Sequence, residues 1–399
     1  REGAEWRQTI VGLDGAGPFS HLDLSALPDA EVGPAIARLS AEQQTAPALY
    51  LNTQVDAAAG TVTFSGAVGS GLATKLAVVT IANSGALNFN STLNITGALT
   101  QTSAATGTTT FSSTVAVGSA VLKGVGFNVN NSFTAASGGA VAVTNSGLFT
   151  LSAAGAITAP GGFSTSGAAL PANNITTTNT ALSIGGALTI ADTRMVTLST
   201  QSIAGAGNIT VTGATVGVTG STAETLVLNA GTGTLSMAAI YGSGTSADDT
   251  GLATVTITKA GTTNFNGDIA ISGVLSQTSA ATGTTAFSST VNVGSATLRG
   301  VAYNVNNSFT AAAAGAIAVT NSGTFTKAAT GIITAPAGFS TSGAALLANN
   351  ITTTNTALSI GGALTIADTR TVTLSTQGAS GVGNITVTGA TVGVTGSTA

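Results

Sequence analysis

The stretch QTSAATGTTTFSSTVAVG at residues 101–118 returns as QTSAATGTTAFSSTVNVG at residues 277–294. Adding 176 to the residue number maps residues 101–223 onto 277–399 without an insertion or deletion, and roughly four in five positions are identical. A weaker match extends back to Leu76 and Leu252. Such repetition is typical of architectures in which each unit buries its apolar face against its neighbours. The sequence therefore predicts one elongated repeat body rather than several ordinary domains.

Apolar residues alternate with small or polar residues inside each copy. Val125, Phe127 and Val129 flank Gly126 and Asn128. Between the copies an outward position changes freely, as when Ala116 becomes Asn292, while its two valine neighbours stay. This is the pattern of a short β-strand with one buried face.

Phenylalanines supply a finer period. Phe89, Phe111 and Phe133 are evenly spaced with a step of 22 in residue number, and 176 is eight times 22. We therefore expect an all-β, elongated parallel β-solenoid of roughly 22-residue coils, with three short strands to a coil and eight coils to a long repeat. Because coils stack at ~4.8 Å, one long repeat is expected to rise ~38 Å, with its two copies nearly identical in conformation.

Residues 1–56 have a different composition. They hold 11 of the chain's 24 charged residues together with Trp6 and His21, the only tryptophan and histidine. One short helix is predicted within about residues 28–44, because Pro34 suits a first turn and Ile36 and Leu39 share a face. The segment is interpreted as a cap or assembly module, or alternatively as a linker.

The rest of the chain, residues 57–399, is predicted to be the solenoid. It contains two long repeats, 76–223 and 252–399, joined by residues 224–251 with an exposed Asp248-Asp249 loop. The second copy stops at Ala399, whereas the first continues from Ala223 into Glu224. Two explanations stay open. Either the chain is a piece of a longer protein, or the N-terminal segment of one molecule covers the C-terminal end of the next.

Composition limits the partners. Net charge is −4 and charged residues make up 6% of the chain, so no electrostatic footprint for nucleic acid is present. The absence of cysteine removes disulfides and thiolate metal sites. No run of ~18 apolar residues predicts a membrane-spanning helix. The mean hydropathy of +0.45, with many Val, Ile and Thr, favours a sheet over disorder.

Few residues suit catalysis or metal binding. His21 has no second histidine and is interpreted as solvated. Asp192 and Arg194 recur as Asp368 and Arg370, which suits a lyase-like site on a strand but more readily a turn-capping pair or an ion pair between coils. The Gly185-Gly186 sequence lacks the aspartate of calcium-binding solenoid turns. We expect no catalytic, cofactor-binding or metal-binding residues.

Two other polar patterns have structural interpretations. Two asparagine clusters are expected at turns, where asparagine tolerates left-handed geometry: Asn128, Asn130 and Asn131, and Asn173 with Asn174. Thr-x-Thr pairs such as Thr210 and Thr212 suit an ice-binding face only if they recur once per coil, and no such recurrence is visible.

The phrases TTFSSTV at 109–115, NNITTTN at 173–179 and GNITVTG at 207–213 resemble the Gly/Thr/Asn-rich arrays of large bacterial surface proteins. The similar group is the filamentous-haemagglutinin-like and autotransporter passenger class, and the resemblance covers residues ~57 to 399. It implies a right-handed parallel β-helix, export to the cell surface, and adhesion or filament formation.

Three functions follow as hypotheses. The first is a structural or adhesive bacterial surface protein, extracellular, whose rigid rod assembles head-to-tail with Trp6 as the assembly anchor. The second is a binding module that uses one solenoid face for a host or matrix glycan, or less readily for ice. The third is an inactive lyase-like β-helix.

Overall fold

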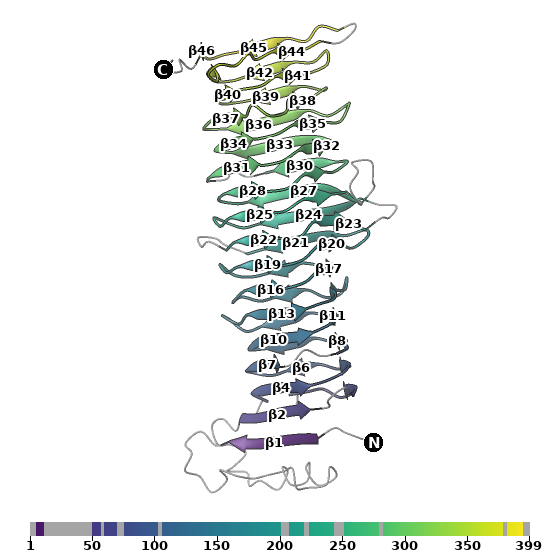
Figure 1. The fold of residues 1–399 in the computed structure, drawn as a ribbon. Helices are drawn as coiled ribbons and strands as arrows, with labels where there is room; N and C mark the ends of the chain where they lie inside the picture. The colour runs from purple at the N-terminus through teal and green to yellow at the C-terminus, as the bar shows by residue number, and fades with distance from the viewer. Residues whose placement is uncertain are drawn as a thin grey trace. The chain divides into compact units, whose positions relative to one another are not determined.

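The computed structural model describes residues 5–11, 50–56, 60–69, 76–102, 106–200, 207–218, 223–242, 251–278, 282–377 and 381–393. Two compact units are present, Arg1–Thr177 and Thr178–Ala399. Each is a parallel β-solenoid, and no helix occurs among the described residues (Figure 1). The expected all-β fold is confirmed. In the described part of the chain no helix is long and apolar enough to cross a membrane.

Unit 1 carries three sheets, designated A, B and C. Sheet A contains β1 (Glu5–Val11), β2 (Tyr50–Asp56), β4 (Val78–Asn83), β7 (Ala98–Gln101), β10 (Ser119–Gly124), β13 (Val141–Asn145) and β16 (Phe163–Thr165). Sheet B contains β3 (Val62–Phe64), β5 (Leu87–Phe89), β8 (Thr108–Phe111), β11 (Gly126–Val129), β14 (Phe149–Leu151) and β17 (Ala169–Pro171). Sheet C contains β6 (Leu93–Asn94), β9 (Val115–Val117), β12 (Phe133–Ala135), β15 (Ile157–Thr158) and β18 (Ile175–Thr176).

Unit 2 repeats this arrangement. Its sheet A contains β19 (Leu182–Ile184), β22 (Ile209–Val211), β25 (Leu235–Met237), β28 (Thr263–Phe265), β31 (Thr284–Phe287), β34 (Ala302–Val305), β37 (Phe325–Lys327), β40 (Ala345–Leu347), β43 (Leu364–Ile366) and β46 (Thr391–Gly393). Sheet B contains β20 (Leu188–Ile190), β23 (Thr215–Gly217), β26 (Ile240–Tyr241), β29 (Ile269–Ala270), β32 (Val291–Val293), β35 (Phe309–Ala311), β38 (Ile333–Thr334), β41 (Ile351–Thr352) and β44 (Leu374–Ser375). Sheet C contains β21 (Met195–Ser199), β24 (Glu224–Asn229), β27 (Leu252–Lys259), β30 (Val274–Gln277), β33 (Ser295–Gly300), β36 (Ile317–Asn321), β39 (Phe339–Thr341), β42 (Leu358–Ile360) and β45 (Ile385–Val387).

From β4 onward, three strands make one coil, and every third strand returns to the same sheet. Phe89 of β5 pairs with Phe111 of β8 in the next coil, as the phenylalanine spacing predicts. Other coils differ in length. Thr108 pairs with Gly126, which makes a shorter coil, and Glu224 pairs with Leu252, which makes a longer one. The strands keep their register while the corners take up the difference in length.

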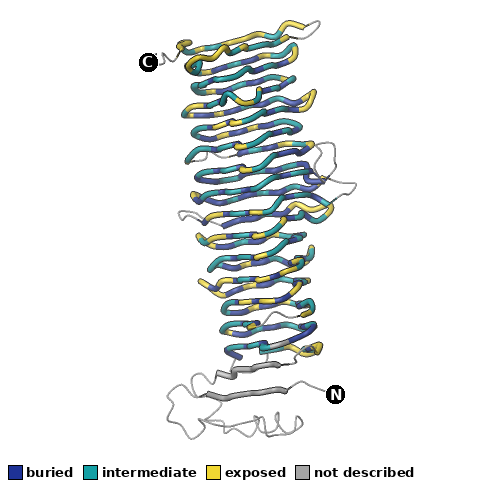
Figure 2. The backbone as a smooth tube through the Cα atoms, in the orientation of Figure 1, coloured by how far each residue is buried: buried dark blue, intermediate teal, exposed yellow. Residues whose placement is uncertain are grey.

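Strand alternation places the core inside each coil. Val115 and Val117 are buried and Ala116 between them is exposed, and the same alternation runs through most strands. Figure 2 shows this alternation along the backbone of both units. Each inward apolar side chain therefore packs on the equivalent residue of the coils on either side, as in other solenoids.

Phenylalanine contacts refine the predicted period. The rings of Phe89 and Phe111 stack at 5.2 Å and 6°, because both belong to sheet B. Phe133 instead pairs with Val115 in sheet C, and its ring meets Phe111 edge-on at 5.4 Å. The spacing between Phe111 and Phe133 is therefore not a coil length, because the coil that contains them is shorter.

The long repeat does not contain a whole number of coils. Within unit 2, β19–β23 recur in sequence as β42–β46, which is 23 strands later, one fewer than eight coils require. Strand β19 lies in sheet A, whereas its repeat β42 lies in sheet C. Likewise β20 lies in sheet B and β43 in sheet A. The prediction of eight coils is wrong by one strand, because corner lengths vary. As a result, each strand of the second copy lies one sheet away from the sheet that holds its equivalent in the first copy, a shift that we call the one-sheet rotation.

The N-terminal strands differ from the rest in direction. Strand β1 pairs antiparallel with β2, and β2 pairs in parallel with β4. Trp6 is a β1 residue opposite Val55 of β2. The helix predicted within residues 28–44, together with His21 and the Asp248-Asp249 loop, lies outside the described residues. The boundary between residues 56 and 57 and the role of Trp6 as an anchor stay predictions.

Candidate functional site

The repeated aspartate–arginine pairs lie in turns. Asp192 and Arg194 are exposed in the turn between β20 and β21, and the turn is closed by Thr193 with a φ of 63°. In the second copy Thr369 repeats this geometry with a φ of 57°. The residues do not share a strand face, so the strand arrangement considered for a lyase-like site is absent here, and the turn interpretation holds.

The asparagines at 130, 131, 173 and 174 lie at corners, as predicted, but with a different backbone geometry. The prediction is wrong for Asn128, which lies within β11 and pairs with Thr110 and Thr150. Asn131 accepts a hydrogen bond on Oδ1 from the Ser132 N–H at 2.8 Å, and Asn173 accepts one from the Asn174 N–H at 2.7 Å. Left-handed φ values occur instead at Asn179 and Asn355. The clusters therefore use their side chains to close turns, while the single asparagine further along supplies the left-handed residue.

Three polar groups are buried inside unit 2, at Tyr303, Lys327 and Glu224. The first surrounds Tyr303, which is fully buried and donates from its hydroxyl to Gln277 Oε1 at 3.2 Å. The Thr285 hydroxyl donates to the same oxygen at 3.3 Å. Burial raises the pKa of Tyr303, so the hydroxyl stays protonated and remains a donor.

The matching cluster in unit 1 lacks this donor. Gln101 and Thr109 occupy the positions of Gln277 and Thr285, and Phe127 stands where unit 2 has tyrosine. Neither polar atom of the Gln101 amide has a hydrogen-bond partner, and the Thr109 hydroxyl has none either. In unit 2 the buried glutamine oxygen therefore accepts hydrogen bonds that the equivalent glutamine oxygen of unit 1 lacks.

The second group is Lys327, which replaces Leu151 of the first copy and is also fully buried. Its Nζ donates to the carbonyl oxygens of Val305 at 3.5 Å, Ala328 at 3.0 Å and Thr330 at 2.5 Å. Burial lowers the pKa of Lys327 to about 8, although the three carbonyl oxygens favour its protonated form.

This lysine changes the corner that follows it. In unit 1 the Gly155 N–H donates to the Ser152 carbonyl at 3.1 Å, and the Leu151 side chain packs against Gly155. In unit 2 the equivalent glycine, Gly331, has a φ of +68°. The corner carbonyls of Ala328 and Thr330 thus accept hydrogen bonds from the Lys327 ammonium group, whereas the Ser152 carbonyl of unit 1 accepts one from a backbone N–H.

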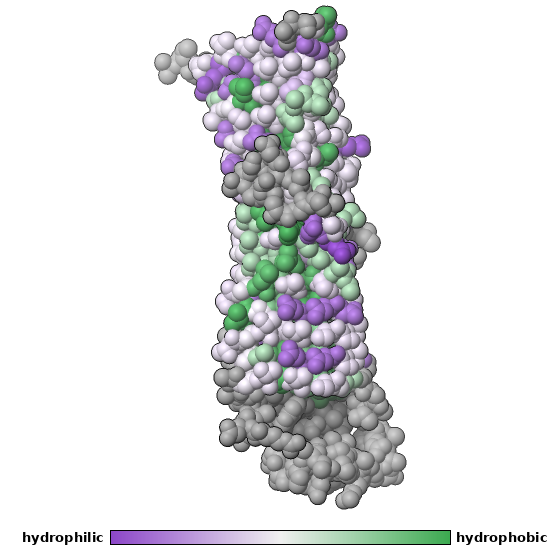
Figure 3. Space-filling view, turned by 90° about the vertical axis from the view of Figure 1, so that its right-hand side faces the viewer, coloured by the Kyte–Doolittle hydropathy of each residue, from purple (hydrophilic) through white to green (hydrophobic). Residues whose placement is uncertain are grey.

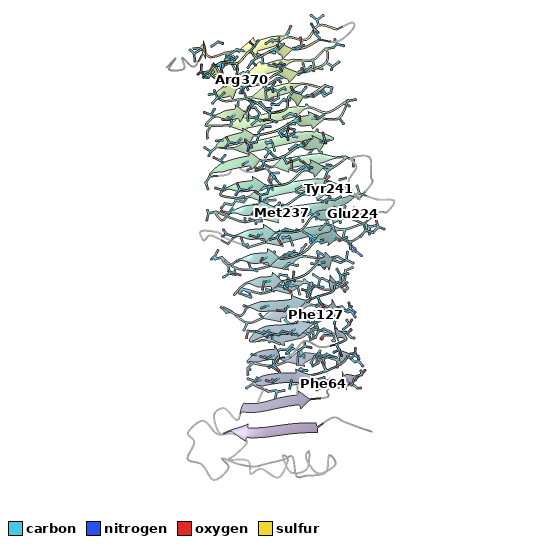
Figure 4. All side chains as sticks on the ribbon, viewed as in Figure 1. Phe64, Phe127, Glu224, Met237, Tyr241 and Arg370 are labelled. Atoms are coloured by element: carbon cyan, nitrogen blue, oxygen red, sulfur yellow. The ribbon has the colours of Figure 1, made fainter. Side chains whose placement is uncertain are left out.

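The third group is Glu224, the first residue of β24 (Figure 4). It has no exposed surface, and no donor meets the geometry of a hydrogen bond to either carboxylate oxygen. Burial raises its pKa, and the neighbouring Asp192 carboxylate adds to the rise. The backbone N–H groups of Glu224 and Thr193 oppose it. The alternation of β24 was the available signal, since it places Glu224 inward with Leu226 and Leu228.

Comparison with known proteins identifies no relative: no family model, curated protein or solved structure matches this chain. Within the described ranges, no three His, Cys, Asp or Glu side chains come together.

Proposed function

We propose that this chain is a structural protein of a bacterial cell surface, whose β-solenoid coils supply length and stiffness outside the cell. Adhesion to a host or matrix glycan is the alternative. The resemblance of residues ~57 to 399 to surface-protein arrays supports the location, and the constraints visible between the two copies support the structural role.

The copies differ mainly where side chains point outward. Exposed positions such as Ala116, Val121 and Leu148 become Asn292, Thr297 and Thr324. Buried differences are mostly apolar replacements, as in Val141 to Ile317 and Pro171 to Leu347. Retention of the inward pattern with free change outside is what a protein needs when stacking, rather than a surface site, is its task.

The one-sheet rotation of the long repeat carries the proposal. A binding face made by duplication keeps one orientation only if the repeat is a whole number of coils. Here the repeat of β19–β23 arrives 23 strands later, so each strand lies in a different sheet of unit 2. The duplication preserved stacking and did not preserve a common face.

The outward column of sheet A in unit 2 is also mixed. From β19 to β46 it reads Ser183, Thr210, Ser236, Asn264, Ala286, Asn304, Thr326, Leu346, Thr365 and Val392. Figure 3 shows that hydrophilic, intermediate and hydrophobic residues are also mixed on the face drawn there. An ice-binding face needs a flat array of one kind, so this column favours a stacking role.

The test has two parts. A variant with one additional copy of the long repeat is expected to lengthen the particle in electron micrographs by ~37 Å, since each coil adds ~4.8 Å. The unmodified chain is expected to show no saturable binding on a glycan array and no inhibition of ice recrystallisation. Saturable binding to a defined glycan, lost when one sheet's outward residues are changed, would favour the binding module instead.

A further inference from the structure

The corner between β28 and β29 contains the sequence Asn266-Gly267, which occurs once in the printed sequence. The Asn266 side chain is exposed and Gly267 is half-buried. A glycine has no Cβ to shield its backbone nitrogen, and its backbone angles are the least restricted of any residue. The corner therefore places an asparagine amide in water directly before an unshielded backbone nitrogen.

The Gly267 N–H has no hydrogen-bond acceptor among the described residues. Another asparagine corner differs in this respect, because the Ser132 N–H donates to Asn131 Oδ1 at 2.8 Å. The Asn266 amide is held by one side-chain contact, in which Nδ2 donates to Ser236 Oγ at 3.1 Å. A nucleophile and an electrophile that adjoin in one chain react as an intramolecular pair, which raises their effective concentration.

Packing favours a glycine at this position. A Cβ added at Gly267 would lie 2.7 Å from the Ala239 nitrogen and 2.9 Å from its Cα, so the corner of the preceding coil leaves no room for a side chain. In the first copy the equivalent sequence is Asn90-Ser91. Asn90 is exposed too, and the Ser91 N–H also has no acceptor in the described ranges. The first copy is therefore a matched comparison in which serine follows the asparagine.

We propose that Asn266 is a site of spontaneous deamidation in the folded chain. The Gly267 nitrogen attacks Cγ of Asn266, a bond from nitrogen to Cγ forms, and the bond from Cγ to Nδ2 breaks. The proton of the Gly267 N–H leaves with the amide group as ammonia, and a cyclic imide remains. Water then opens the imide. Opening at Cγ gives aspartate, and opening at the backbone carbonyl carbon gives isoaspartate.

Isoaspartate lengthens the main chain of the corner by one methylene group. The corner is fixed on both sides of the reacting bond, because the Asn266 N–H donates to the Met237 carbonyl at 2.9 Å and the Asp268 carbonyl accepts from the Ile240 N–H at 2.8 Å. A longer main chain cannot keep both bonds together with the registers of β28 and β29. The new carboxylate also adds a negative charge two residues before Asp268. Deamidation therefore weakens the contact between these coils as the protein ages.

The experiment incubates the folded full-length chain at mildly alkaline pH and maps its peptides by mass spectrometry, with enzymatic methylation to detect isoaspartate. We expect Asn266 to gain one mass unit and to yield isoaspartate, while Asn90 in the same sample stays intact. Ser91→Gly gives the first copy the same dipeptide and should make Asn90 react as well. Ageing should lower the unfolding temperature of the wild type and leave that of Asn266→Gln unchanged.

Four results would overturn the proposal. An Asn266 that stays intact as long as Asn90, or that reacts only in urea, would show that the folded corner protects it. Aspartate without isoaspartate would show direct hydrolysis of the side-chain amide instead of attack by Gly267. A Ser91→Gly chain whose Asn90 does not react would show that the glycine is not the determinant. An unfolding temperature that is unchanged at full conversion would contradict the weakened contact between coils.

Discussion

At the scale of single residues, the core of each unit tolerates polar side chains best where a neighbouring backbone or amide group forms hydrogen bonds with them. Lys327 lies in an inward column between Val305 and Leu347, a place where the first copy has leucine. Its ammonium group is held by three carbonyl oxygens. Removing an ammonium from water is costly even when its donors are paired, so apolar replacements of buried charges are often stabilising.

Lys327→Leu is therefore expected to stabilise the chain at neutral pH by at most about 3 kcal/mol. In the folded chain the pKa of Lys327 is lowered to about 8 from 10.5, so the unfolded chain binds more protons between these values. Wild-type stability should rise as the pH increases from about 8 to about 10.5, and that rise should vanish in the variant. Urea denaturation at several pH values measures both effects, and Leu151→Lys is the reciprocal control.

The Tyr303 cluster gives a second residue-scale prediction. Phe127→Tyr should place a hydroxyl beside Gln101, as Tyr303 does beside Gln277, and stabilise the chain by about 1 kcal/mol. Tyr303→Phe should cost a similar amount, because Gln277 loses one of its two donors. Denaturant midpoints of the two variants check this pair. A destabilised Phe127→Tyr would mean that the unit 1 core has no space for the hydroxyl.

At the scale of elements, hydrogen bonds at the corners link successive coils, in addition to the pairing between strands. The Asn145 amide at the end of β13 donates to the carbonyls of Gly147 at 2.7 Å and Ala168 at 3.1 Å. It also accepts from the Gly167 N–H at 2.9 Å. Asn321 repeats these bonds in unit 2 with Gly323, Ala344 and Gly343. One buried asparagine thus satisfies backbone groups of two corners, one coil apart.

Asn145→Ala and Asn321→Ala are each expected to destabilise the chain by about 2 kcal/mol, because buried backbone groups lose their partners. The exposed Asn130 supplies the control, and Asn130→Ala should change stability by less than about 0.5 kcal/mol. Thermal unfolding measures all three. Similar effects at Asn130 and Asn145 would show that the corner amides are not the source of the stability.

The elements also show how far sequence reasoning reaches. Alternation around Val115–Val117 was sufficient to predict strands and their buried faces, because the period of two is a local property. The one-sheet rotation was not predictable, because it depends on corner lengths, which differ from coil to coil. Glu224 was missed for a similar reason. Its neighbour Asp192 lies one coil earlier. The number of residues between the two depends on the length of that particular coil, so an average period does not predict that they meet.

At the scale of the whole molecule, the long repeat is duplicated in sequence, but its two copies do not place equivalent strands in the same sheet. Thr100 and Ser276 precede equivalent copies, so joining Thr100 directly to Gln277 recreates the junction that the first copy already has. In such a chain β31 would follow β7 and is expected to take the place of β8 beside β5. The inward residues of β31, Thr285 and Phe287, are those of β8.

Deletion of residues 101–276 should therefore leave a folded solenoid that carries a single copy of the long repeat. Its far-UV circular dichroism per residue should equal that of the full chain, and its unfolding should stay cooperative, because each coil depends only on its neighbours. A deletion of residues 101–118 alone is the control. It removes β8 and β9, which are two of the three strands of a coil. Strand β10 (Ser119–Gly124) would then follow β7 directly and would have to pair in sheet B, although its side chains fit sheet A. This variant should therefore misfold. If the long deletion aggregates while the short one folds, the coils are not interchangeable and the structural role proposed for the repeat fails.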